Sequence, residues 1–231
     1  MALAIIGYSL CSSTLLLANK MAIHYLPSPS IVSFAQILFS AVAVLIIKAT
    51  GYPVDWFEWE KMKAYSIYII IFVAAIFTNM KALAVSNVET VIVFRACTPI
   101  AVSIIEYFFM DRELPSLRSS ISLSVVAIGA LLYCLSDSQI SLHGIGSYTW
   151  VFIYFVLITL EMTYGKKLTA TVKMESVWGP VLYCNFLSIP PMFMLAYFQG
   201  DFNGLSNLLA EMPAMGTSVL LFSCVAGTLI G

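Results

Sequence analysis

Long apolar stretches alternate with short polar connections along nearly the whole chain of 231 residues. A helix needs about 20 apolar residues to cross the hydrocarbon core of a bilayer. By this criterion the pattern predicts eight membrane-spanning helices. Their predicted ranges are 3–25, 29–49, 64–86, 89–110, 117–136, 147–167, 174–198 and 214–231. The sequence therefore predicts an all-α fold, a polytopic bundle of transmembrane helices.

The connections between these segments are short and contain residues that favour turns. They are Pro27–Ser30, Gly51–Pro53, Ser86–Asn87, Pro115–Ser116, Asp137–Ser138, Gly144–Gly146 and Gly200–Gly204. None of them is long enough to form a soluble domain. The predicted bundle therefore accounts for the whole chain.

The low content of charged residues agrees with a membrane protein, and the distribution of Lys and Arg indicates which side of the bundle faces the cytosol. The chain is 61% hydrophobic and 10% charged, whereas soluble domains are about 25% charged. If the N-terminus faces the cytosol, the cytosolic connections hold eight of the eleven Lys and Arg residues. These are Lys48, Lys61, Lys63, Arg112, Arg118, Lys166, Lys167 and Lys173. Cytosolic loops are normally enriched in Lys and Arg, so we expect a cytosolic N-terminus.

Several kinds of function lack sequence support. The chain has no basic run for nucleic acid, and all five cysteines fall inside apolar segments, without the spacing of a metal site or a disulfide framework. The two histidines, both near loops, offer little material for acid–base catalysis. We therefore expect no enzyme activity, no cofactor, no bound metal and no nucleic-acid partner.

Three cations remain within or at the ends of apolar segments, namely Lys20, Lys81 and Arg95. Burying a cation in hydrocarbon costs about 3 kcal/mol on insertion scales, so such residues usually face a polar cavity or a partner. The alternating topology places all three toward the non-cytosolic half of the membrane. Converging on one cavity, they would suit a substrate with several negative charges. For Lys81, extension to lipid headgroups is the simpler interpretation, whereas the depth of Arg95 favours anion binding.

Other polar side chains also lie at membrane depth. Glu106 and Glu161 are interpreted as structural counter-ions for Lys166, Lys167 or Arg112, with a role in proton relay as the alternative. Tyr183 and Asn185 combine hydrogen-bond donors and acceptors that can recognise a base. For Asn185, a hydrogen bond between helices is an equally good explanation.

Several short strings occur in the order found in nucleotide-sugar transporters. They are Ser9–Ser13, Ala18–Lys20, Ile76–Asn79, Ser86–Arg95 with Thr98 and Pro99, Glu161–Tyr164 with Lys166, and Leu182–Asn185 with Leu187 and Ser188. Over essentially its whole length the chain resembles this family of the drug/metabolite transporter superfamily. It is most similar to the GDP-mannose and GDP-fucose branch, which is related to triose-phosphate translocators.

The resemblance implies a ten-helix carrier built from two inverted five-helix repeats, with the substrate site between them. Residues 1–137 would form the first repeat, and residues 138–231 would form three helices of an incomplete second repeat. The implied activity is a multi-pass Golgi antiporter that exchanges a nucleotide sugar, GDP-linked, for a luminal nucleoside monophosphate. Its partners would be these two ligands and the lipid bilayer, and a homodimer is left open.

The resemblance also implies roles for individual residues. Tyr183 and Asn185 would recognise the base, although Cys184 replaces an Asn of the family string, which leaves guanine selectivity open. Asn19 and Lys20 are similar to part of a Gly-x-x-Asn-Lys string that binds sugar and phosphates, and which we expect beyond Gly231. Lys20 and Arg95 would attract the phosphates.

Two alternatives remain at this stage. A phosphorylated-sugar or triose-phosphate translocator would keep the cationic residues but would not need the base-reading pair. A truncated, non-transporting membrane protein that regulates a full-length partner would explain an incomplete second repeat.

Overall fold

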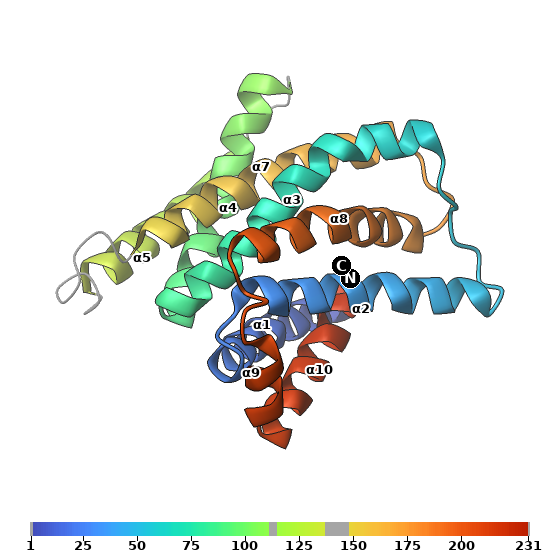
Figure 1. Cartoon of the computed structure of the whole chain (residues 1–231). Coiled ribbons are helices and arrows are strands. Elements are labelled where there is room, and N and C mark those ends of the chain that lie inside the picture. The colour runs from blue at the N-terminus through green and yellow to red at the C-terminus, as the bar shows by residue number, and fades with distance from the viewer. Residues whose placement is uncertain (1, 111–114, 137–147, 231) are drawn as a thin grey trace.

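The computed structural model describes residues 2–110, 115–136 and 148–230, and its regular secondary structure in these ranges is helical. The helices are α1 (Ala2–Tyr25), α2 (Pro29–Ala49), α3 (Trp59–Val85), α4 (Val88–Phe109), α5 (Leu117–Ser136), α7 (Thr149–Thr171), α8 (Trp178–Phe198), α9 (Leu205–Glu211) and α10 (Ala214–Ile230). Figure 1 shows α2, α3, α7 and α8 side by side, with α4 and α5 on one flank and α9 and α10 on another.

The all-α prediction is confirmed, because each of the eight predicted segments contains a helix. The predicted bounds of α2 and α5 agree with the structure. Helix α3 begins at Trp59, earlier than predicted, and α8 begins at Trp178, four residues later than predicted. The short α9 was not predicted. Arg112 and the turns at 137–138 and 144–146 lie outside the described residues.

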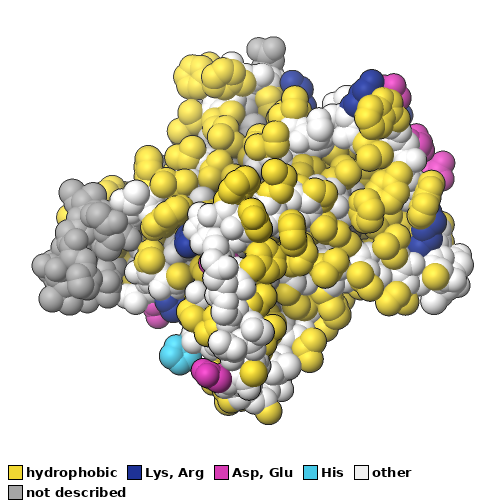
Figure 2. Space-filling model, in the orientation of Figure 1, with side chains coloured by type: hydrophobic (Ala, Val, Ile, Leu, Met, Phe, Trp, Pro, Cys, Tyr) yellow, Lys and Arg dark blue, Asp and Glu magenta, His cyan; other side chains and the backbone are white. Residues whose placement is uncertain are grey.

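Within the described residues, five helices are long and apolar enough to cross a membrane by length and composition, or six if α9 and α10, which meet at 110°, count as one span. The five are α2, α3, α4, α5 and α8. Large hydrophobic side chains are exposed along them, such as Ile70, Phe109 and Leu135. Figure 2 shows hydrophobic side chains over most of the visible face. In water such a surface is unfavourable, whereas in lipid it is the expected one, so this is a multi-pass membrane protein.

Most of the large helix contacts join a helix from the first part of the chain to one from the second part. Helix α3 packs against α7 and α8, while α10 packs against α1 and α2. Helix α2 also packs against α8, and α4 packs against α7. Apolar side chains fill these contacts, and Met80, Leu83 and Val151 are almost fully buried in one cluster. The helices before residue 137 thus interlock with those after residue 147.

A polar contact joins the two halves of the described chain at one end of the bundle. The Asp55 carboxylate, in the α2–α3 connection, accepts hydrogen bonds from the backbone N–H groups of Glu175 (3.1 Å) and Ser176 (2.9 Å), just before α8. The Lys61 ammonium lies 3.5 Å from the same carboxylate. Both N–H groups precede Val177, the N-cap residue of α8, and the carboxylate supplies the acceptors that backbone donors require. This contact fixes the chain immediately before α8.

Tyr183 reinforces the same contact from within α8. Its hydroxyl donates to the carbonyl of Trp56 at 2.7 Å and accepts from the N–H of Glu58 at 2.8 Å. We call the contacts of Asp55 and Tyr183 with these backbone groups the inter-loop latch. It holds the α2–α3 connection against the α7–α8 connection and the first turns of α8.

Candidate functional site

A cavity of about 370 Å³ lies among helices from both halves of the chain. Helices α1, α2, α3, α4, α7, α8 and α10 all contribute to its wall. Its polar and charged lining residues are Asn19, Gln36, Ser40, Asn79, Arg95, Tyr154, Glu161 and Asn185. Amides and charged groups are unfavourable inside a membrane unless they face a polar space or each other. The concentration of such groups makes this the candidate binding site, which we call the central cavity.

Helical periodicity explains why these side chains meet. On α3 the lining residues Phe72, Ile76 and Asn79 lie on one face, because residues three, four and seven positions apart share a side of a helix. On α7, Ile158 and Glu161 are related by the same spacing. Each helix thus turns one face to the cavity and its other faces to neighbouring helices or to lipid.

The central cavity is lined in part by a network of neutral polar groups. The Gln36 amide donates to Asn19 Oδ1 at 2.8 Å and to the Ser223 hydroxyl at 3.1 Å, which connects α2 with α1 and α10. The hydroxyls of Ser40 and Thr228 lie 2.9 Å apart. The pairing of these polar groups within hydrocarbon depth stabilises the helix contacts.

Two opposite charges face the cavity elsewhere. Glu161 on α7 accepts a 2.6 Å hydrogen bond from the Tyr68 hydroxyl on α3. Arg95 on α4 interacts with Glu161 electrostatically, yet no ion pair within 4.0 Å joins them among the described residues. The cavity therefore offers a cation and a carboxylate at separate places.

Two amides complete the lining. Asn185 donates to the carbonyl of Val181 at 2.9 Å, one turn earlier on α8. Asn79 Oδ1 is buried and has no hydrogen-bond partner within the described part of the chain. A buried acceptor without a partner is costly. A ligand that brings a hydroxyl or N–H group to the cavity would satisfy Asn79.

The structure brings three of the residues predicted for the site into the central cavity, namely Asn19, Arg95 and Asn185. Lys20 lies elsewhere: its ammonium donates to the carbonyls of Ser86, at 2.9 Å, and Leu83. These carbonyls end α3, where they have no partner within the helix. Lys20 lines a separate cavity of about 310 Å³ with His24 and Leu83.

Tyr183 is likewise outside the central cavity. Its side chain is fully buried, its ring lies among Phe57 and Tyr65, and both hydrogen bonds of its hydroxyl belong to the inter-loop latch. The role predicted for Tyr183 in base recognition stays a prediction. In this conformation no part of its hydroxyl is directed to the cavity.

The expectation that Lys20, Lys81 and Arg95 share one cavity is wrong for this structure. Lys81 lies 5.5 Å from the ring centroid of Phe77 and does not line the central cavity. A cation near an aromatic face is stabilised by the ring quadrupole. Each of the two lysines thus has a local partner, which leaves Arg95 as the cation of the central cavity among the described residues.

The predicted counter-ion role is confirmed for Glu106 and wrong for Glu161. Glu106 forms a 2.7 Å ion pair with Lys166. Glu161 instead faces the central cavity, and its hydrogen bond comes from Tyr68. The sequence interpretation failed because Lys166 pairs with Glu106 on α4, whereas Tyr68 reaches Glu161 from α3.

Sequence analysis also missed Gln36 and Asn79. Gln36 is an amide in the otherwise apolar segment 29–49, and Asn79 lies in a similar position in segment 64–86. Polar residues inside apolar spans are frequently functional, so this signal was available. Which of them share a cavity could be learned only from the packing.

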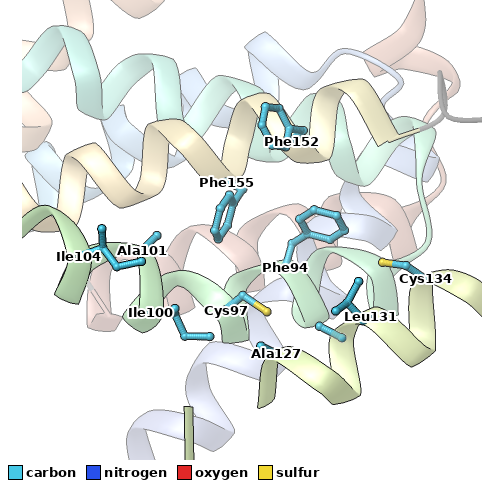
Figure 3. A pocket seen from close by; sticks show the side chains of 11 residues that line it. Phe94, Cys97, Ile100, Ala101, Ile104, Ala127, Leu131, Cys134, Phe152 and Phe155 are labelled. Carbon is cyan, nitrogen blue, oxygen red and sulfur yellow. The ribbon is translucent and has the colours of Figure 1, made fainter. Parts of the chain in front are cut away.

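A second cavity, of about 330 Å³, lies between α4, α5 and α7 (Figure 3). Figure 3 shows Phe94, Cys97 and Phe155 at its wall, and its lining is apolar. It offers no charged partner for an anion. Phe94 and Arg95 are consecutive on α4, so they direct the apolar and the cationic side chain into different cavities. Within the described ranges, no group of three His, Cys, Asp or Glu residues could hold a metal ion.

Comparison with curated proteins identifies relatives that are named as transporters, which agrees with a membrane protein. No family model matches the chain. GDP-fucose transporter 1 of Arabidopsis thaliana is 38% identical over 98% of this chain and 67% of its own length. A GDP-mannose transporter of Arabidopsis thaliana is 33% identical over 78% of this chain and 47% of its own length.

A more distant relative is the GDP-mannose transporter of Eremothecium gossypii, which is 24% identical over 84% of this chain and 62% of its own length. The chain thus spans between about half and two thirds of the length of these curated relatives. All three are transporters by name, which agrees with the expectation that the chain is not an enzyme.

Proposed function

Because the chain belongs to the nucleotide-sugar transporter family, we propose that it moves a GDP-linked sugar across the Golgi membrane in exchange for a nucleoside monophosphate. The observation that carries the proposal is the placement of Arg95 in a cavity lined by both halves of the chain. A guanidinium binds phosphate oxygens through two parallel hydrogen bonds. The names of the relatives supply the GDP-linked class of sugar.

The neutral polar groups of the cavity suit the other parts of this ligand. Asn79 offers a buried acceptor without a protein partner, which a sugar hydroxyl can satisfy. Asn185 retains hydrogen-bonding capacity beyond its bond to Val181, since an amide has two N–H groups and two acceptor lone pairs. Asn19 also lines the cavity and accepts a hydrogen bond from Gln36.

The related helix contacts support the two-repeat architecture, with residues 1–137 as the first repeat and 138–231 as part of the second. If α1, α2 and α3 correspond to α7, α8 and α10, the contact of α3 with α7 corresponds to that of α10 with α1. The contact of α3 with α8 then corresponds to that of α10 with α2. In carriers of this design, substrate binds where the repeats meet.

The end that carries the inter-loop latch would face the cytosol. Lys48 and Lys61 lie in the helix ends that flank the α2–α3 connection. Lys166 lies near the end of α7, and Lys173 lies in the α7–α8 connection. The enrichment of basic residues at cytosolic loops supports this orientation and a cytosolic N-terminus. Movement of one repeat relative to the other would then require the latch to open.

The function can be tested by reconstituting the chain in liposomes that are preloaded with GMP. Labelled GDP-fucose and GDP-mannose would be supplied outside, with UDP-sugars and a triose phosphate as comparison substrates. We expect uptake of a GDP-sugar that depends on internal GMP. Uptake of triose phosphate without uptake of nucleotide sugar would favour the phosphate-translocator alternative.

Arg95→Gln should lower GDP-sugar uptake by about tenfold or more, because a hydrogen bond to a charged group contributes about 1.5–3 kcal/mol. Lys81→Gln is the matched control, since it removes a membrane cation that lies outside the central cavity. Equal loss in both variants would contradict a specific role for Arg95. A folded, correctly inserted chain that exchanges no nucleotide sugar would contradict the proposed function and favour a non-transporting role.

A further inference from the structure

We propose that Glu161 is the guanine-selective residue of the central cavity, accepting hydrogen bonds from the N1–H and N2–H groups of the base. This assignment rests on the proposed function and deepens it. Its basis is the position of the carboxylate among the cavity residues, its bond to Tyr68 and the chemistry of the ligand.

A carboxylate is an unexpected group in a binding site for a diphosphate. Glu161 repels phosphate oxygens, so it must face a part of the ligand that donates hydrogen bonds. An ionised carboxylate accepts hydrogen bonds and donates none. Guanine presents its N1–H and its exocyclic N2–H side by side, and both oxygens of a carboxylate can accept from such a pair. Uracil offers one N–H group on the corresponding edge.

The carboxylate is held in place by α3. Tyr68 donates to Glu161 Oε1 at 2.6 Å, and the Tyr68 ring stacks against Phe72 and Tyr164. A Cβ at Gly165 would lie 3.3 Å from the Tyr68 ring, so glycine there permits the close approach of α7 to this ring. The tyrosine uses one lone pair of Oε1, and each carboxylate oxygen has two. Both oxygens therefore keep capacity for a ligand.

The surroundings fit a purine base. Phe72 lines the same cavity and offers an aromatic surface, and bases stack on aromatic side chains. Arg95, more than an ion-pair distance away, is the place for the phosphates. The separated charges would thus orient the nucleotide, with the guanine edge toward α7 and the phosphates toward α4.

This role would also account for Cys184. Cysteine is a weak hydrogen-bond partner, so the residue that precedes Asn185 contributes little to base recognition. The carboxylate could therefore supply, from α7, the acceptor for guanine that a cysteine on α8 does not provide.

The test is equilibrium binding of GMP, IMP and UMP to the purified chain in lipid nanodiscs. IMP differs from GMP in lacking the exocyclic amino group, so the GMP-to-IMP affinity ratio isolates that contact. We expect the unaltered chain to prefer GMP by about tenfold to a hundredfold, the range for one hydrogen bond to a charged group. Glu161→Gln should bring the ratio close to one. The NH₂ group of the glutamine would then face an N–H group of guanine, and two donors cannot form a hydrogen bond.

Tyr68→Phe provides a milder variant that keeps the carboxylate but removes the bond that fixes it, and it should lower the ratio partially. Glu106→Gln is the matched control, since it removes a membrane carboxylate that pairs with Lys166 outside the cavity. It should leave the ratio unchanged. Size-exclusion profiles and thermal unfolding would verify that each variant is folded.

The alternatives predict different results. If Glu161 serves only as a counter-ion for Arg95, Glu161→Gln should strengthen binding of all three nucleotides alike. If it serves only to hold Tyr68, the variant should lose thermal stability with an unchanged GMP-to-IMP ratio. Either result would overturn the assignment but leave the proposed function intact. Failure of the unaltered chain to bind any of the three would overturn both.

Discussion

The Asp55 carboxylate accepts a 2.9 Å hydrogen bond from the backbone N–H of Ser176, a residue that follows it by 121 positions in the sequence. The side chain of Asp55 is only 3% exposed, although it lies in a connection at the end of the bundle. This bond ties the connection between α2 and α3 to the start of α8. Such a tie should be measurable in the stability of the protein.

Asp55→Asn should lower the thermal stability of the protein, with a free-energy loss of about 2 kcal/mol, because hydrogen bonds to a charged group are replaced by weaker ones. Glu58→Gln is the matched control: Glu58 pairs with the same Lys61, but its side chain is 60% exposed. Exposed ion pairs contribute little. Thermal unfolding in detergent, followed by size exclusion, would compare them, and equal losses would contradict a special role for Asp55.

The latch should also depend on pH. Burial raises the pKa of the Asp55 carboxyl, but the N–H groups of Glu175 and Ser176, together with the Lys61 ammonium, outweigh burial and lower this pKa below the usual value of 3.8. Because the folded-state pKa is the lower one, the stabilisation is complete above about pH 4 and is lost as the pH falls through the folded-state value.

The difference in unfolding temperature between the unaltered chain and Asp55→Asn should therefore be constant from pH 7 to about pH 5 and shrink in more acidic solution. A series of unfolding curves across this range would measure it. A difference that grew on acidification would show that the carboxylate is not the stabilising form.

Gly179→Ala should destabilise the same region. A Cβ at this position would lie 2.5 Å from Asp55 Oδ2 and 3.0 Å from its Cγ. The carboxylate cannot move away freely, because two backbone N–H groups hold it. We expect a loss of about 1–3 kcal/mol, as for other overpacked sites. Gly129→Ala, on the exposed side of α5 with no atom within 4 Å, is the control.

In the background of Asp55→Ala, the effect of Gly179→Ala should be smaller, because the crowding carboxylate is gone. A double-mutant cycle in unfolding free energy would measure this coupling. Additive losses would mean that the two residues act independently.

Tyr183→Phe separates the two roles considered for this residue. Removal of the hydroxyl leaves the carbonyl of Trp56 and the N–H of Glu58 without their partner. We expect a stability loss of about 1–3 kcal/mol, the usual range for buried groups left unpaired, with GMP affinity unchanged in the folded protein. Binding and unfolding would be measured on the same preparation. Weaker GMP binding at unchanged stability would instead support direct base recognition by Tyr183.

Lys20→Met should likewise act on stability rather than on phosphate binding. The lysine ammonium satisfies the carbonyls of Leu83 and Ser86 at the end of α3. We expect a lower unfolding temperature and an unchanged salt dependence of GMP binding, whereas Arg95→Gln should reduce that salt dependence. A reduced salt dependence for Lys20→Met would place its charge near the bound phosphate.

The helices were predictable because their signal is local. Apolar runs such as 29–49 and 117–136 are long enough to span a bilayer, and the turn-forming residues between them end each helix. The attachment of the chain just before α8 to Asp55 was not predictable, since it joins two connections that lie far apart in the sequence.

The candidate site was only partly predictable for the same reason. Arg95 and Asn185 could be singled out as polar groups at membrane depth, and both line the central cavity. Lys20 has the same sequence signal, but the packing of α1 against α3 gives it carbonyl partners. Glu161 looked like a counter-ion for nearby lysines, yet Tyr68 from α3 holds it in the cavity.

The sequence by itself determined that this is a helical membrane protein, where its eight long apolar segments lie and which few residues are charged at depth, because hydrophobicity and turn chemistry act between neighbours in the chain. Only the tertiary structure decided which of those charged and polar groups share a cavity and which are used in capping and packing. That choice depends on contacts such as Tyr68 with Glu161 and Asp55 with Ser176, between residues far apart in sequence whose proximity arises from helix packing.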